Sequence, residues 1–141
     1  MSDPMNALDR SEVAEPEGRW TARFMLFLRA MALLSLIKGL YHWALVIGIG
    51  QGPFSAFETS STAWQAATIY FSVIDLVAAV GLWLAAAWGG VVWLTATISM
   101  AAIELMFPQV YGGRTVVIFG EVAMLIAYFV LAVAAARERP D

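Results

Sequence analysis

Four long apolar segments constrain this chain more than any other feature of its sequence. They cover residues 24–48, 63–87, 88–107 and 115–136, and each reaches the roughly 20 residues that a helix needs to cross about 30 Å of hydrocarbon. Apolar residues make up 61% of the 141 residues and charged residues only 13%, a balance that a small soluble domain has too little interior to bury. The sequence therefore predicts an all-α membrane protein, with a four-helix transmembrane bundle in residues 20–136 and the lipid bilayer as its surroundings.

The segments outside the apolar stretches predict the topology. Residues 1–19 are acidic, contain two prolines and lack a hydrophobic period, which is typical of a disordered tail; residues 137–141 form a short second tail. Basic residues gather near the two chain ends, whereas Arg114 stands alone on the opposite side. Because cytoplasmic flanks are enriched in Lys and Arg, we expect both termini in the cytoplasm of a bacterium, with the chain in its inner membrane as a multi-pass protein.

The composition excludes several chemistries. The chain has no Cys and one His, so disulfide scaffolds, iron–sulfur clusters, thiolate zinc sites and multi-histidine metal sites are excluded. A net charge of -3 argues against nucleic acid as a partner, and no glycine-rich phosphate-binding loop is present. We therefore expect neither a cofactor nor a metal.

Ionisable residues inside the expected spans are the main functional signal, because each charge in hydrocarbon is costly unless a partner compensates it. They are Lys38, His42, Asp75, Glu104 and Glu121. Counted at ~1.5 Å per residue, Lys38 and Asp75 fall near the midplane, so we expect them to pair across neighbouring helices. His42 shares a helix face with Lys38 because the two are four residues apart. Such charges either fix helix pairing or line a transport path, and the sequence leaves both interpretations open.

Two arginines border this polar set. Arg29 lies about two turns inside the first apolar segment, and its side chain is expected to reach back to the nearer membrane interface. Arg114 lies in the loop before the fourth segment, where it could pair with Glu121.

Small and aromatic residues indicate how the helices pack. Gly81, Ala85 and Gly89 recur every four residues, a spacing that permits close helix contact, and we expect them on one face of the second helix. The turn to the third helix is expected at Trp88–Gly89–Gly90. Tryptophans gather at membrane interfaces, so we expect four of them to act as interface anchors. These are Trp64, Trp83, Trp88 and Trp93.

Several of these residues also carry a resemblance to a known family. The stretch WQAATIYFSVIDLVAAVGLWL (64–84), with WGGVVWL (88–94), resembles the central signature of an uncharacterised bacterial family of small four-helix inner-membrane proteins. LIKGLYHWALVIG (36–48) is similar to that family's first helix. The resemblance implies the same fold over about residues 36–136 and no activity. Carried over residue by residue, it singles out Trp64, Asp75, Gly81, Trp83 and Trp88. A looser similarity, through the first helix, is to DoxX-like membrane proteins.

Three functions fit these observations. The first, which we adopt as the expectation, is a non-enzymatic accessory or assembly subunit of the membrane, acting as a homo-oligomer or within a larger complex. The second is a proton- or cation-linked transporter or channel, with Lys38 and Asp75 at the midplane and His42, Glu104 and Glu121 forming a vestibule. The third is a membrane enzyme acting on lipid or quinone, for which the sequence identifies neither a nucleophile nor a metal site.

Overall fold

The computed structural model describes residues 18–50 and 56–138, which form helices joined by short connections. Four helices are long and apolar enough to cross a membrane. They are α2 (Arg19–Val46), α4 (Thr62–Trp83), α5 (Ala87–Met106) and α7 (Thr115–Arg137), and two single-turn helices, α3 (Ala56–Thr59) and α6 (Pro108–Tyr111), lie between them. The expected all-α, four-helix architecture is confirmed. Most of the expected acidic tail, residues 1–17, lies outside the described residues.

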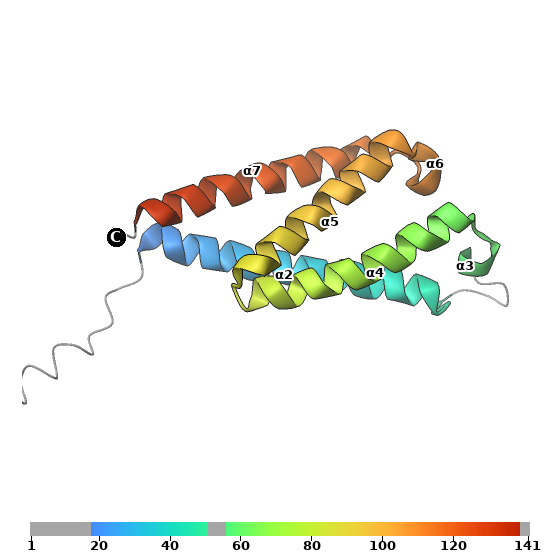
Figure 1. Cartoon of the computed structure of the whole chain (residues 1–141), viewed down its shortest axis with the longest axis horizontal. Coiled ribbons are helices and arrows are strands. Elements are labelled where there is room, and N and C mark those ends of the chain that lie inside the picture. Colours follow the sequence, from blue (N-terminus) through green and yellow to red (C-terminus); the bar gives the residue numbers. More distant parts are fainter. Residues whose placement is uncertain (1–17, 51–55, 139–141) are drawn as a thin grey trace, which may run out of the picture.

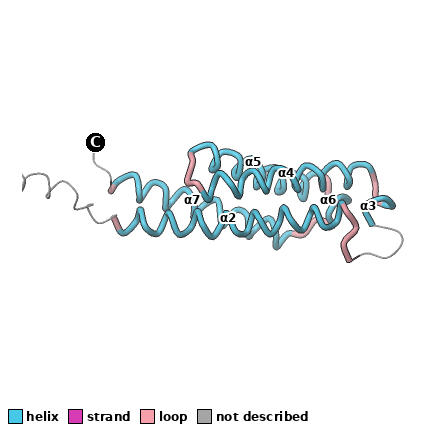
Figure 2. Tube along the Cα trace, turned by 90° about the horizontal axis from the view of Figure 1, so that it is seen from below, coloured by secondary structure: helices cyan, strands magenta, loops and turns pink. Residues whose placement is uncertain are grey.

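The long helices run alternately up and down the bundle (Figure 1). Helix α2 packs against α4 and α7, and α5 packs against the same two helices. We call the end where α2 begins and α7 ends the terminus end; the opposite end, which carries α3 and α6, is the loop end (Figure 2). The bundle therefore places both ends of the described chain at the same end of the bundle.

Two apolar clusters form the interior. One lies toward the terminus end and contains the buried residues Leu28, Ala32, Ala78, Leu82 and Trp93. The other lies toward the loop end and contains Ala67, Phe71 and Met100. Trp93 is thus a core residue, 5% exposed, and its expected role as an interface anchor is wrong. Its ring packs against Phe27 and Tyr128, since these aromatic rings offer more contact inside the bundle than the interface does.

Helix α2 begins at Arg19, five residues before the expected start at residue 24, because a distant side chain caps it. Gly18 provides no side-chain cap. Instead the Glu138 carboxylate, just after α7, accepts hydrogen bonds from the backbone N–H groups of Trp20 (2.9 Å) and Thr21 (3.0 Å). The Trp20 N–H is the main reason that the pKa of Glu138 lies below its ordinary value. A helix start with free N–H groups favours such an anion, and this contact joins the start of α2 to the end of α7.

The α4–α5 hairpin turns at residues 84–86, not at the expected Trp88–Gly90. Ala85 adopts a positive φ of 51°. The N–H of Ala86 donates to the Gly81 carbonyl and that of Ala85 to the Leu82 carbonyl, which is a Schellman ending of α4. Ala85 therefore lies in the turn and Gly89 on α5, so the expectation that both lie on a face of the second helix is wrong.

Gly81 and Gly89 nevertheless form a tight interface, on two different helices. A Cβ added to Gly89 would collide with the backbone of Gly81, and one added to Gly81 would collide with the Cα of Gly89. Glycine is needed here because only a missing side chain allows two helix backbones to approach so closely. Gly89, which the sequence placed in a turn, therefore belongs to a helix-packing surface.

We expect Gly89→Ala to lower the free energy of unfolding by about 1–3 kcal/mol, because overpacking forces the two helix backbones apart. The matched control is Gly120→Ala on α7, where an added Cβ meets nothing within 4 Å. The control should be neutral or slightly stabilising, since Ala favours helix more than Gly does. Thermal unfolding in detergent measures both, and equal effects of the two variants would contradict the tight interface.

Candidate functional site

Four ionisable side chains from three helices meet inside the bundle, and we call them the ionic cluster: Lys38, His42, Asp75 and Glu121. Lys38 Nζ lies 3.7 Å from Asp75 Oδ1 and 3.9 Å from Glu121 Oε1. His42 Nδ1 lies 3.9 Å from Asp75 Oδ2. One lysine from α2 is therefore shared between a carboxylate of α4 and a carboxylate of α7, and four of the five residues expected inside the membrane are together.

Glycine at position 39 brings the two sides of the cluster together. Gly39 is buried, and a Cβ there would lie 2.8 Å from the Leu76 side chain and 3.2 Å from the Leu76 backbone nitrogen. Leu76 follows Asp75 in the chain, as Gly39 follows Lys38. Gly39 thus allows α2 to approach α4 beside the ion pair. We did not single it out from the sequence, where its only signal is its place between Lys38 and His42.

Apart from the partly exposed Lys38, the cluster is buried, but it is loosely bonded. The Asp75 side chain is 1% exposed, yet all three charge contacts are longer than ordinary hydrogen bonds. Within residues 18–50 and 56–138, Asp75 Oδ2 and Glu121 Oε2 have no hydrogen-bond partner. His42 Nδ1 lies 2.9 Å from the Lys38 carbonyl oxygen; because a carbonyl only accepts, Nδ1 carries the proton in this contact. Unsatisfied carboxylate oxygens at these distances leave acceptor positions for a proton, a water or a partner's donor.

Glu104, the fifth ionisable residue expected inside the membrane, lies apart from the ionic cluster. Its side chain is fully buried, and Oε2 accepts a 2.8 Å hydrogen bond from the Arg114 backbone N–H. Arg114 Nε lies 3.8 Å from Glu104 Oε1, so the expected pairing of Arg114 with Glu121 is wrong. The reason is the order of the chain: the α6 turn returns Arg114 over the end of α5, where Glu104 lies. This contact holds the connection between α5 and α7.

Aromatic rings close the loop end of the cluster. The Tyr111 ring lies 6.3 Å from the rings of both His42 and Phe71, and Trp64 lies 6.4 Å from Tyr111. Burial raises the pKa of Tyr111, and its hydroxyl lies 3.2 Å from Thr68 Oγ1. Trp64 is therefore half-buried against Tyr111, whereas Trp83 and Trp88 are exposed as anchors would be.

Residues 22–139 match the family of unknown function DUF6163. The chain belongs to this family. The expected membership of an uncharacterised family of four-helix proteins is thus confirmed, while the looser likeness to DoxX-like proteins finds no support. Neither the comparison with curated proteins nor that with solved structures found a match. The matched range includes the whole ionic cluster and all four long helices apart from the first residues of α2.

The ionic cluster of this DUF6163 protein opens sideways. A cavity of about 220 Å³ lies between α2, α5 and α7, and both Lys38 and Glu121 line it. The apolar cluster around Trp93 closes the terminus end and the Tyr111 rings close the loop end. Among the described residues, no group of three or more His, Cys, Asp or Glu side chains is placed to hold a metal ion. The arrangement can hold or exchange a proton and can accept a donor that enters laterally.

We expect Lys38→Met to lower the free energy of unfolding, because Asp75 and Glu121 then lose the cation that they share. Lys38→Met combined with Asp75→Asn should recover part of that loss, with a coupling energy of about 0.5–3 kcal/mol in a double-mutant cycle. Arg23→Met, outside the cluster, should be additive with Asp75→Asn. Additivity of the Lys38 and Asp75 substitutions would contradict a direct interaction.

Proposed function

We propose that this protein is a non-enzymatic accessory or assembly subunit of the bacterial inner membrane. It acts as a homo-oligomer or as part of a larger membrane complex, with both termini in the cytoplasm. The single observation that carries the proposal is the exposure of Lys38. Its side chain is 31% exposed, while the carboxylates of Asp75 and Glu121 that it serves are 1% and 11% exposed.

A partly exposed ammonium is costly at the depth of Lys38. The residue lies eight positions before the end of α2, which places it about 12 Å from that end of the helix. An ammonium facing hydrocarbon at such a depth needs a polar partner or water. A neighbouring helix that covers the cavity between α2, α5 and α7 would bury Lys38 and supply donors for the unsatisfied oxygen of Glu121.

The weak cover that α7 receives within one chain supports the same proposal. Only Glu121 and Ala135 are buried among the 23 residues of α7. This helix carries a carboxylate of the cluster while most of its apolar surface faces outward, including Val116 and Phe119. A second protein packed on α2 and α7 would cover the exposed surface of α7. It would at the same time supply partners for the ionic cluster, because the cavity beside Lys38 borders the same two helices.

We expect the tagged protein, purified from its native membrane in mild detergent, to elute as a defined assembly larger than one chain. Mass spectrometry then shows either copies of this chain alone or one further protein in fixed ratio. The natural chain has no Cys, so single cysteines report its contacts without background. Gly120→Cys, which lines the cavity beside Lys38, should be protected from a membrane-permeant maleimide in the native membrane.

The matched control is Met106→Cys at the end of α5, which is 71% exposed and does not line the cavity. Because maleimide reacts with the thiolate, and a thiol at the end of the span reaches interfacial water, this variant should react freely in the same membranes. A monomeric protein in which both cysteines react equally would overturn the assembly role.

A second function, proton- or cation-linked transport, is favoured by a different observation. Asp75 and Glu121 share one lysine, and each has a buried oxygen that forms no hydrogen bond within the part of the chain that the structure describes. With Lys38 charged and His42 neutral, the two carboxylates leave one uncompensated negative charge, which a bound proton or cation would neutralise. Because apolar and aromatic residues close both ends of the cluster in one chain, transport would need movement of α7 or an assembly of several copies.

For this second function we expect Asp75→Asn to abolish proton or cation flux in proteoliposomes while the protein keeps its elution volume and helix content. Glu138→Gln, a carboxylate change at the terminus end, is the control and should keep the flux of the natural protein. Flux that is unchanged in Asp75→Asn would exclude the cluster as the transport site.

A further inference from the structure

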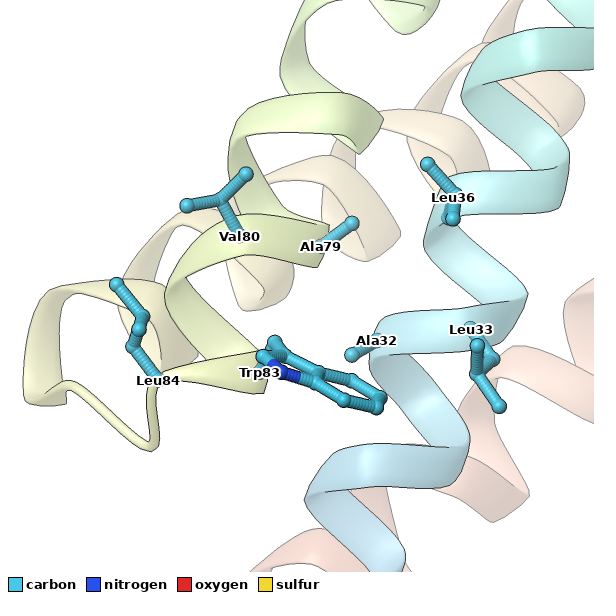
Figure 3. A pocket seen from close by; sticks show the side chains of 7 residues that line it. All are labelled: Ala32, Leu33, Leu36, Ala79, Val80, Trp83 and Leu84. Carbon is cyan, nitrogen blue, oxygen red and sulfur yellow. The ribbon is translucent and has the colours of Figure 1, made fainter.

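An apolar groove runs between α2 and α4 on the outer face of the bundle, apart from the ionic cluster. Figure 3 shows Ala32 and Leu36 of α2 and Ala79 and Trp83 of α4 between the two helices; Leu33 and Val80 also line the groove, and their side chains point outward at its two sides. Its volume is about 220 Å³. The two alanines are buried and form the floor, whereas Leu33, Val80 and Trp83 are exposed and form the walls. Small residues below and large residues beside them give the groove a depth that suits a narrow hydrocarbon chain.

A cation lies at the terminus end of this groove. The Trp83 ring extends from α4 toward Ala32 (Figure 3), and the Arg29 guanidinium carbon lies 4.6 Å from the centre of that ring. Arg29 lies one helical turn before Leu33, on the same face of α2. Within the described ranges Arg29 is exposed and forms no ion pair with any carboxylate.

The position of Arg29 along α2 indicates what could pair with its unpaired guanidinium. Arg29 is ten residues from the start of α2, about 15 Å along the helix, and its side chain reaches back toward the terminus end. That position is close to the level of lipid headgroups. Stacking on Trp83 uses one face of the guanidinium and leaves the N–H groups at its edge free, in the fork that binds a phosphate through two hydrogen bonds.

We propose that this groove binds an anionic glycerophospholipid of the surrounding bilayer. One acyl chain lies over Ala32 and Ala79, between the walls formed by Leu33 and Val80, and the phosphate contacts Arg29. Two features select this occupant: the charge at the groove's end is positive and unpaired, and the groove continues from that charge into the hydrocarbon layer. An acidic protein segment is the less suitable occupant: its carboxylate could contact Arg29, but it has no acyl chain to fill the groove.

The test uses the full chain in nanodiscs that contain equal amounts of dioleoyl phosphatidylglycerol and dioleoyl phosphatidylcholine. After extraction into mild detergent, native mass spectrometry counts the lipids that stay bound. Because one arginine at the membrane surface favours an anionic lipid by about fivefold, we expect the natural protein to retain phosphatidylglycerol over phosphatidylcholine by about that ratio. Arg29→Gln should reduce the ratio to about one.

The matched control is Arg23→Gln. Arg23 lies 4.9 Å from the centre of the Trp20 ring, so it makes the same kind of cation–aromatic contact, but on a tryptophan that does not line the groove, whereas Trp83 does. This variant should keep the preference of the natural protein. Thermal unfolding in phosphatidylcholine alone should be equal for all three proteins, which separates lipid binding from folding. The proposal is overturned if the natural protein shows no preference, if Arg29→Gln keeps it, or if Arg23→Gln loses it to the same extent.

Discussion

The sharing of Lys38 between two buried carboxylates is the interaction on which the rest of the bundle depends. Inside a bilayer an isolated charge is costly, so Asp75 of α4 and Glu121 of α7 must both face Lys38, the cation that α2 places at their level. This requirement sets the rotation of three helices about their axes and places α2 between α4 and α7. Gly39 makes the approach of α2 and α4 close enough for the pair, and the apolar clusters then fill the space toward each end.

The two edges of α2 have different properties. Its edge with α7 is polar, because Lys38 and Glu121 line a lateral cavity there. On the outer face, beyond the Lys38–Asp75 pair, α2 forms an apolar groove with α4, and Arg29 lies at one end of that groove. A protein partner suits the first edge, since unsatisfied oxygens need donors, and a lipid suits the second, since an acyl chain needs no hydrogen bonds. The same helix can therefore serve an assembly and the bilayer without competition between them.

Part of the site follows from local sequence and part does not. The i,i+4 spacing of Lys38 and His42 places them on one face of any helix, and the depth of Asp75 makes it a natural partner for Lys38. Nothing local shows that Arg114 turns toward Glu104, because that contact depends on the path of the α6 turn. Gly89 and Trp93 were misassigned for a related reason. A glycine pair fits a turn as well as a close helix contact, and a tryptophan fits an interface as well as a core.

The sequence by itself determined that the chain has four segments able to cross a membrane, and which charged residues lie inside them. Hydropathy and charge can be read from each segment alone. The four candidate spans, apart from the first residues of α2, all lie within residues 22–139, which match the family. Only the tertiary structure decided which charged residues meet, that Gly81 and Gly89 touch across two helices, and that Lys38 stays partly exposed beside a cavity. Those properties depend on how each helix is rotated against its neighbours, and rotation is settled by contacts between residues far apart in the chain, such as Trp20 and Glu138.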